Sequence, residues 1–150
     1  MSVVKLFNNQ AGFPEQILDG LRSSIDPFPQ GDLSTTEIRK EWGERLSAEG
    51  WISNYLIPDS RLHISFWKSN FGVCVQLGNT CRVNSDMLKL ETLFRQRRLE
   101  AAALVVPTDS YSRHLGSNHA SVGTAERDLT VFSVAVTVPI AVVGVGPQRG

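Results

Sequence analysis

The chain has 150 residues, is 41% hydrophobic and 20% charged, and carries a formal net charge of zero. This length and balance are typical of one soluble globular domain, so we expect a single domain over residues 1–150. A neutral chain has no overall field that attracts nucleic acid or membrane, so such binding would need a local patch. We find no signal-peptide pattern and no apolar run of about 18 residues, so we expect a cytoplasmic protein without a membrane partner.

The two cysteines predict free thiols. Cys74 and Cys81 lie seven residues apart, and no second pair accompanies them. That number and spacing match neither a disulfide framework nor a zinc site.

The first third of the chain predicts two helices between short strands. The expected elements are a short strand or arm over residues 1–7, a helix over 13–24, a helix over 34–49 and a strand over 51–57. The second helix has the clearest start, because Ser34 and Glu37 have the spacing of a capping box. Gly50 stands where a helix-terminating glycine belongs.

Residues 61–82, RLHISFWKSNFGVCVQLGNTCR, predict a β-hairpin, because both arms alternate polar and apolar residues. A four-residue loop over 68–71 would pair Trp67 with Gly72. That register places four polar side chains on one face, in two cross-strand pairs: Ser65 with Cys74, and His63 with Gln76. A shift of one residue would scatter them.

The rest of the chain alternates helices and strands. We expect a helix over 83–98, a strand over 99–106, a polar loop over 107–118, a helix over 119–135 and a strand over 140–145. The buried stripe predicted for the first of these helices is Met87, Leu88, Leu90, Leu93 and Phe94. That helix can act as a right-handed crossover to a parallel strand. The predicted fold is α/β, with a mixed five-stranded sheet of antiparallel hairpin strands and parallel strands flanked by helices.

Four segments carry a family resemblance: Gly50-Trp51, HISFWKSNFGVCVQLGNTCRVNSDMLKLETLF, LVVP and PIAVVGVG. VQLGN followed by Arg82, and then SDMLKLETL, are its most specific parts. Together they resemble the BglII-like branch of the type II restriction endonucleases, within the PD-(D/E)XK nuclease superfamily. The resemblance implies a restriction-endonuclease-like core, in agreement with the predicted fold. It also implies a homodimer that acts on palindromic duplex DNA.

The family site is where this chain departs from the pattern. The family cuts DNA with a divalent metal, using an Asp on the first arm, a Glu nine residues later and a Gln two residues beyond. These positions hold Ser65, Cys74 and Gln76 here, so both carboxylates are absent. A hydroxyl and a thiol cannot replace two anionic oxygen ligands of Mg²⁺. We therefore expect a catalytically degenerate protein that binds DNA without metal-dependent cleavage and needs no cofactor.

Two alternatives stay open. One is an active Mg²⁺-dependent endonuclease whose carboxylates have moved to Asp59, Asp86 or Glu91. The simpler interpretation makes Asp59 a turn residue, Asp86 a first-turn helix residue and Glu91 a solvated residue on a helix face. The other alternative is a non-enzymatic oligomerisation or interaction module.

Several basic residues are candidates for contacting phosphates: Lys68, Arg82, Arg95, Arg97 and Arg98. The last three also suit the C-terminal end of a helix, where cations are favoured. A His63–Cys74 nucleophile and base would lie on the polar face, but no orienting acid accompanies it. Cys74 is more simply interpreted as a small, partly buried apolar residue.

Overall fold

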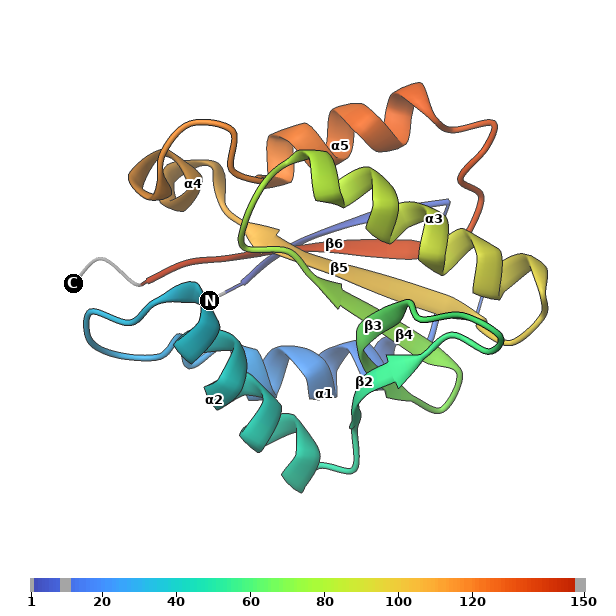
Figure 1. Ribbon diagram of the computed structural model, residues 1–150, viewed down its shortest axis with the longest axis horizontal. Helices are drawn as coiled ribbons and strands as arrows, with labels where there is room; N and C mark the ends of the chain where they lie inside the picture. The colour runs from blue at the N-terminus through green and yellow to red at the C-terminus, as the bar shows by residue number, and fades with distance from the viewer. Residues whose placement is uncertain (1, 9–11, 148–150) are drawn as a thin grey trace.

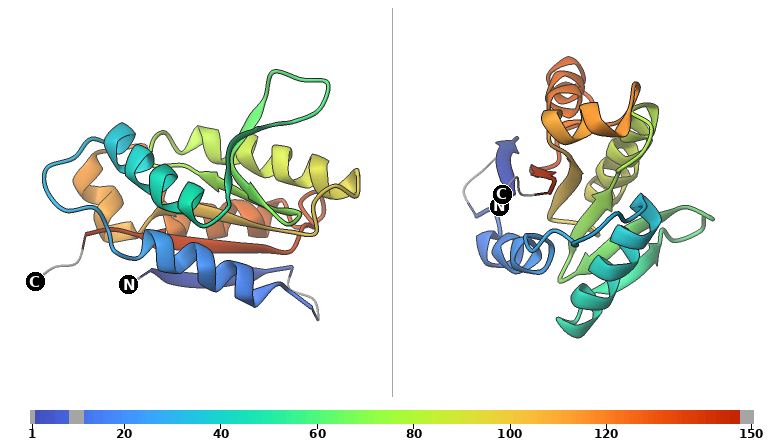
Figure 2. Two further views of the ribbon diagram at one scale, coloured as in Figure 1. Left: turned by 90° about the horizontal axis from the view of Figure 1, so that it is seen from below. Right: turned by 90° about the vertical axis from the view of Figure 1, so that its left-hand side faces the viewer.

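One mixed sheet runs through the middle of the molecule, and helices cover both of its faces (Figures 1 and 2). It is seen in a computed structural model that describes residues 2–8 and 12–147. The strands are β1 (Val3–Phe7), β2 (Ile52–Leu56), β3 (His63–Lys68), β4 (Phe71–Val75), β5 (Ala101–Pro107) and β6 (Ile140–Val145). The helices are α1 (Glu15–Ile25), α2 (Thr35–Ala48), α3 (Cys81–Arg95), α4 (Asp109–Leu115) and α5 (Val122–Val131).

The strand order is β1-β6-β5-β4-β3-β2. Strands β2, β3 and β4 form an antiparallel meander, and α3 carries the chain from β4 across to the parallel strand β5. Strand β6 is parallel to β5, as a second crossover requires. This architecture confirms the predicted α/β class with a mixed sheet flanked by helices.

The predicted number of five strands was wrong, because the sheet has six. The sixth is β1, which pairs antiparallel with β6 from Val3 opposite Gly144 to Phe7 opposite Ile140. Four of its five residues are apolar, but all five are exposed or half-buried, because β1 lies at the edge of the sheet. A pairing partner more than 130 residues away decides its conformation.

Two apolar layers hold the helices on the sheet. Along β5, Ala102, Leu104 and Val106 face the α3 and α5 side, while the alternate residues face α1 and α2. Helix α3 approaches the sheet closely at Gly72, where an added Cβ would lie 2.7 Å from Leu99 Cδ1 and 3.2 Å from Leu90 Cδ2. A glycine is therefore needed there for the packing of α3.

Local signals placed two turns well. Ser34 caps α2, since its side chain accepts from the Glu37 amide and the Glu37 carboxylate accepts from the Ser34 amide. In the hairpin, Trp67 pairs with Gly72 as predicted, but Lys68 also pairs with Phe71. The loop therefore has two residues, not four, and both have the positive φ that a primed hairpin turn requires.

The largest local error is the predicted loop over 107–118, which contains α4. Thr108 begins this short helix by accepting a hydrogen bond from the Tyr111 amide. Helix α5 is shorter than predicted at both ends, and α3 begins two residues earlier and ends three earlier. Leu88 was wrongly placed in the buried stripe of α3, because 63% of it is exposed. No helix of the described residues is long and apolar enough to span a membrane.

Candidate functional site

A polar pocket opens where β3 and β4 stop pairing with each other. Their ladder ends at Phe66 opposite Val73, and beyond it Ser65 Oγ accepts a hydrogen bond from the Val75 amide at 2.9 Å. From there β3 continues to pair with β2, and β4 with β5. The predicted cross-strand pairs Ser65–Cys74 and His63–Gln76 are therefore absent from the ladder.

The four predicted polar residues nevertheless share one cavity. The pocket has a volume of about 370 Å³ and is lined by Ser65, Cys74, Gln76 and His63 together with residues of α2 and α3. The residues added by the two helices include Arg39, Arg82, Asp86 and Lys89. The polar face predicted from the alternation of the hairpin is thus one wall of a real pocket.

The Cys74 thiol lines this pocket and is not activated as a nucleophile. Cys74 is 2% exposed. Burial raises the pKa of its thiol well above the usual range, and the nearby Asp86 carboxylate raises it further. The thiol is therefore protonated at neutral pH, which removes the nucleophile needed by the His63–Cys74 alternative.

Gln76 links the strand to the acidic residue of α3. Its Nε2 donates to Asp86 Oδ2 at 3.3 Å, and its Oε1 accepts from the Gly78 amide at 3.1 Å. The other Asp86 oxygen lies 3.7 Å from Lys89 Nζ. Asp86 is only 7% exposed, and burial raises the pKa of its carboxyl although Gln76, Lys89 and Arg39 oppose that shift.

Asp86 is therefore not the first-turn residue that the sequence suggested. Helix α3 begins at Cys81, so Asp86 lies in its second turn and faces the pocket. Of the three candidate displaced acids, it is the one that the fold brings to the family positions.

Glu91 is turned away from the pocket, and its predicted exposure was wrong. It is 5% exposed. Its Oε1 accepts from the amides of Thr137 and Val138 at 2.9 and 2.8 Å, and its Oε2 accepts from Thr137 Oγ1 at 2.8 Å and Arg95 Nε at 2.7 Å. These contacts fasten α3 to the segment that enters β6.

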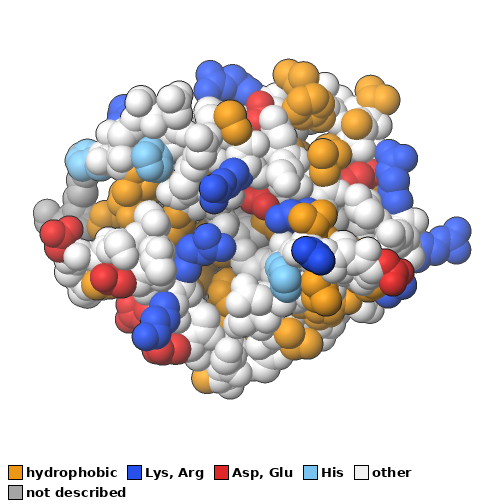
Figure 3. Space-filling view, in the orientation of Figure 1, with side chains coloured by type: hydrophobic (Ala, Val, Ile, Leu, Met, Phe, Trp, Pro, Cys, Tyr) orange, Lys and Arg blue, Asp and Glu red, His pale blue; other side chains and the backbone are white. Residues whose placement is uncertain are grey.

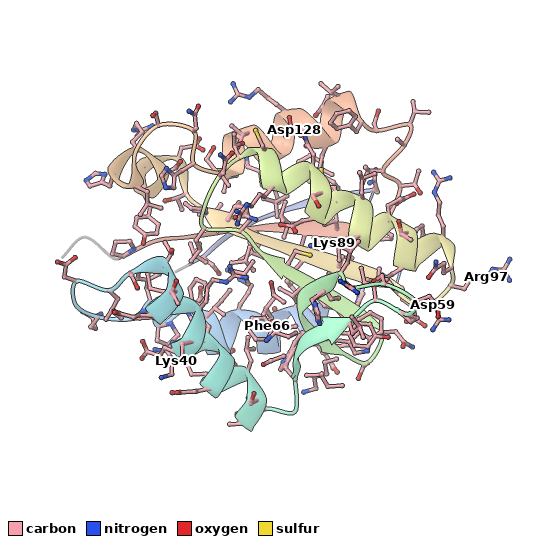
Figure 4. All side chains as sticks on the ribbon, in the orientation of Figure 1. Lys40, Asp59, Phe66, Lys89, Arg97 and Asp128 are labelled. Carbon is pink, nitrogen blue, oxygen red and sulfur yellow. The ribbon has the colours of Figure 1, made fainter. Side chains whose placement is uncertain are left out.

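Asp59 lies in the loop between β2 and β3, which projects from the body of the molecule (Figure 2). Figure 4 shows it near the end of the molecule where α3 terminates. Its φ of 59° and the serine that follows it are features of a turn, as the simpler interpretation proposed. Asp59 does not line the pocket.

Comparison with known proteins decides the family. The family model described as restriction endonuclease BglII/BglIII matches residues 13–145. The chain belongs to this family. The comparison with curated proteins gives no match.

Two solved structures show the same fold as this BglII-family chain. One is the crystal structure of restriction endonuclease BglII complexed with a DNA 16-mer, with a TM-score of 0.81 and 14% identity. It is matched over 99% of this chain and 77% of that one. The other is free BglII, with a TM-score of 0.76 and 17% identity over 99% of this chain and 80% of that one.

The site of this BglII-family member does not suit Mg²⁺. Mg²⁺ demands near-octahedral oxygen coordination, usually with one or two carboxylates. Here Ser65 already accepts a backbone hydrogen bond and Cys74 presents a protonated thiol, and of the described residues Asp86 alone supplies a carboxylate to the pocket. Among the described residues, no group of three His, Cys, Asp or Glu side chains is placed to hold a metal ion.

The basic residues predicted to contact phosphates are spread over the molecule. Of these, Arg82 lines the pocket, whereas Lys68 donates to the Glu49 carbonyl at 2.6 Å and lies over Trp51. Arg95 is bound to Glu91, at the far end of α3. Arg97 extends outward beyond that end (Figure 4), and neither it nor Arg98 lines the pocket.

The cation that the sequence did not single out is Arg39. It lies on α2, more than 40 residues before Arg82 and Lys89, and reaches the same pocket. No spacing in the sequence indicates this meeting, because it depends on how α2 and α3 pack against the sheet. Among the described residues, three cations, Arg39, Arg82 and Lys89, therefore line the same pocket as the Asp86 carboxylate.

Proposed function

We propose that this protein binds duplex DNA through the pocket face and does not cleave it with a divalent metal. The observation that carries the proposal is the chemistry at the two family carboxylate positions. Ser65 is held by the Val75 amide, and Cys74 is buried as a protonated thiol. Neither residue supplies the anionic oxygen that the family's chemistry needs.

The charge distribution supports DNA binding. The whole chain is neutral, so attraction to DNA has to come from a local patch. Arg39, Arg82 and Lys89 gather at the pocket, with Asp86 as their opposing carboxylate. Figure 3 shows basic side chains spread around an acidic one in the middle of this face. Cations in such an arrangement can contact backbone phosphates.

The direct test combines a gel shift with plasmid nicking. We expect a duplex to be retained at low salt in EDTA, with an affinity that falls steeply as salt is raised. Addition of Mg²⁺ or Mn²⁺ should give no nicking. No retention at low salt would instead favour the non-enzymatic interaction module, and nicking that depends on the metal would overturn the proposal.

A second candidate function is a Mg²⁺-dependent nuclease in which Asp86 is the displaced carboxylate. The supporting observation is that Asp86 shares the pocket with Gln76 and lies within hydrogen-bonding distance of it. Asp86→Asn separates the two functions. A nuclease would lose metal-dependent nicking, whereas a binding protein would hold DNA more tightly because a carboxylate has left the phosphate-binding face.

Restoring the family acids tests whether their absence is what prevents cleavage. Ser65→Asp combined with Cys74→Glu would place two carboxylates at the family positions. We expect this double variant to gain Mg²⁺-dependent nicking that the parent protein lacks. Ser65→Asn with Cys74→Gln is the matched neutral control, and circular dichroism should show that both double variants are folded.

The homodimer implied by the resemblance is also part of this proposal. Two copies would present two pockets to the two strands of a palindromic duplex. Sedimentation equilibrium with and without DNA measures the stoichiometry. A strict monomer that binds DNA one to one would remove the dimer and leave the proposed binding intact.

A further inference from the structure

A second cavity lies directly beside the pocket. It has a volume of about 360 Å³ and shares Arg39 and Ser65 with the pocket. Its other polar residues come from α2 and β2: Thr36, Lys40, Ser53 and Asn54. We call it the α2 cavity. The two cavities are therefore neighbours, and Ser65 and Arg39 belong to the wall that they share.

The chemistry of the α2 cavity suits an anion. Among the described residues, two cations, three hydroxyl groups and one amide line it, and no carboxylate does. Two neighbouring acids of α2 are engaged elsewhere: Glu37 accepts from the Ser34 amide, and Glu41 pairs with Arg45 at 3.0 Å. These contacts leave Arg39 and Lys40 as the charges that α2 presents to the cavity.

The edge strand is distorted at the same place. Ser53 pairs with Phe66 and Tyr55 with Ile64, but Asn54 between them makes no ladder pair and has a φ of 53°. Asparagine is one of the few side chains that tolerate this conformation. Such distortions gather at functional sites, where a binding requirement outweighs the regular ladder.

We propose that the α2 cavity holds the backbone phosphate next to the one held in the pocket. One DNA strand then passes over Ser65, and Arg39 stands between two consecutive phosphates. This track deepens the proposed function and rests on it. It makes Lys40 a DNA-contacting residue, and it makes Arg39 the residue whose loss affects both phosphates.

Gly43 offers a way to block the track without breaking the fold. It lines the α2 cavity, and an added Cβ would meet only the Phe66 ring, at 3.8 Å. Any other ordinary residue there also suits a helix better than glycine. Gly43→Glu would place a carboxylate in the cavity, and Gly43→Gln is its neutral control of the same size. Gly20→Glu on α1 is the distant control, because nothing lies within 4 Å of an added Cβ there.

The experiment measures duplex affinity by fluorescence anisotropy in EDTA over a series of salt concentrations. We expect Lys40→Ala to weaken binding about tenfold at low salt and to reduce the slope of log K against log salt by about one. Arg39→Ala should reduce it further. Gly43→Glu should weaken binding more than Gly43→Gln does, and Gly20→Glu should leave it unchanged. Arg127→Ala, on α5, is the control for loss of one positive charge.

The outcomes separate this inference from the proposed function. If the parent protein binds no DNA, both fail. If it binds DNA but Lys40→Ala matches Arg127→Ala, or Gly43→Glu matches Gly43→Gln, the track alone is overturned. A second arm titrates inorganic phosphate in place of DNA. Saturable binding of phosphate alone, as tight as that of the duplex, would overturn a backbone track in favour of a free-phosphate site.

Discussion

Two buried carboxylates on α3, Asp86 and Glu91, differ in how fully they are hydrogen-bonded and in the direction of their pKa shifts. Glu91 accepts four hydrogen bonds, from Arg95, Thr137 and Val138, and although burial raises its pKa, these bonds hold the pKa below the ordinary value. Asp86 accepts one hydrogen bond of 3.3 Å and has Lys89 at 3.7 Å, and its pKa is raised because burial dominates. The first carboxylate stabilises the fold, and the second is left poorly compensated.

The difference shows which end of α3 is built for stability. A buried carboxylate is costly unless its oxygens are hydrogen-bonded. The Glu91 end meets this condition and joins α3 to the start of β6. The Asp86 end does not, and it opens into a pocket lined by cations from two helices. Asp86 is only weakly paired with these cations, which leaves the cations available to a ligand. A binding pocket requires such available charges.

The largest expected effect comes from Glu91→Gln. The variant loses the anionic acceptor of four hydrogen bonds, so we expect the free energy of unfolding to fall by about 3 kcal/mol. For a chain of this length, thermal denaturation should then occur about 6–12 °C lower. Glu100→Gln, at an exposed position, is the control. A change below about 0.5 kcal/mol would show that the Glu91 contacts do not hold α3 to β6.

The acid side of the stability profile should report the same residue. The folded-state pKa of Glu91 is lowered, so its contribution to stability is complete above the ordinary glutamate pKa of 4.5 and is lost as pH falls through the folded value. Urea denaturation of the parent protein and Glu91→Gln should therefore give curves that converge below pH 4.5. Parallel curves through that range would contradict this linkage.

Asp86→Asn should act in the opposite direction and by less. The raised pKa means that stability is lost as pH rises from the ordinary aspartate pKa of 3.8 through the folded value. Removing the charge should therefore stabilise the protein at pH 7, by up to about 1 kcal/mol, and the gain should vanish in acid. Urea denaturation at both pH values measures it. Destabilisation at pH 7 would show that the contacts with Gln76 and Lys89 outweigh burial.

The smallest expected effect is a difference in the rate at which a thiol reagent modifies the two cysteines, one of which, Cys74, lies near Asp86. Cys74 is buried and protonated, whereas Cys81 is exposed at the start of α3. We expect a thiol reagent to modify one cysteine quickly in the folded protein and the second only after denaturation. In Cys81→Ser the fast phase should disappear. A fast phase that survives in this variant would mean that the pocket admits reagents to Cys74.

Patterns within a few residues were enough for much of this architecture. The capping box began α2 at the right residue, and the apolar run over 140–145 matched β6. The predicted pairing of Trp67 with Gly72 was also right, because alternation and turn composition act between neighbouring residues, but the ladder ends before Ser65 and Cys74. Strand β1 and helix α4 were missed or left open, since β1 depends on a distant partner and α4 on one cap and local packing.

The sequence by itself identified the hairpin, and its resemblance to the family placed Ser65, Cys74 and Gln76 at the family positions. The loss of the two carboxylates there stays a prediction. The tertiary structure decided which way each side chain faces. Asp86 and Glu91 are five residues apart on one helix, which turns them about 140° from each other. Only the packing of α3 on the sheet shows that one faces the pocket and the other the entry to β6. The same packing brings Arg39 to Arg82 and Lys89, because cations from separate helices meet only when both helices are docked.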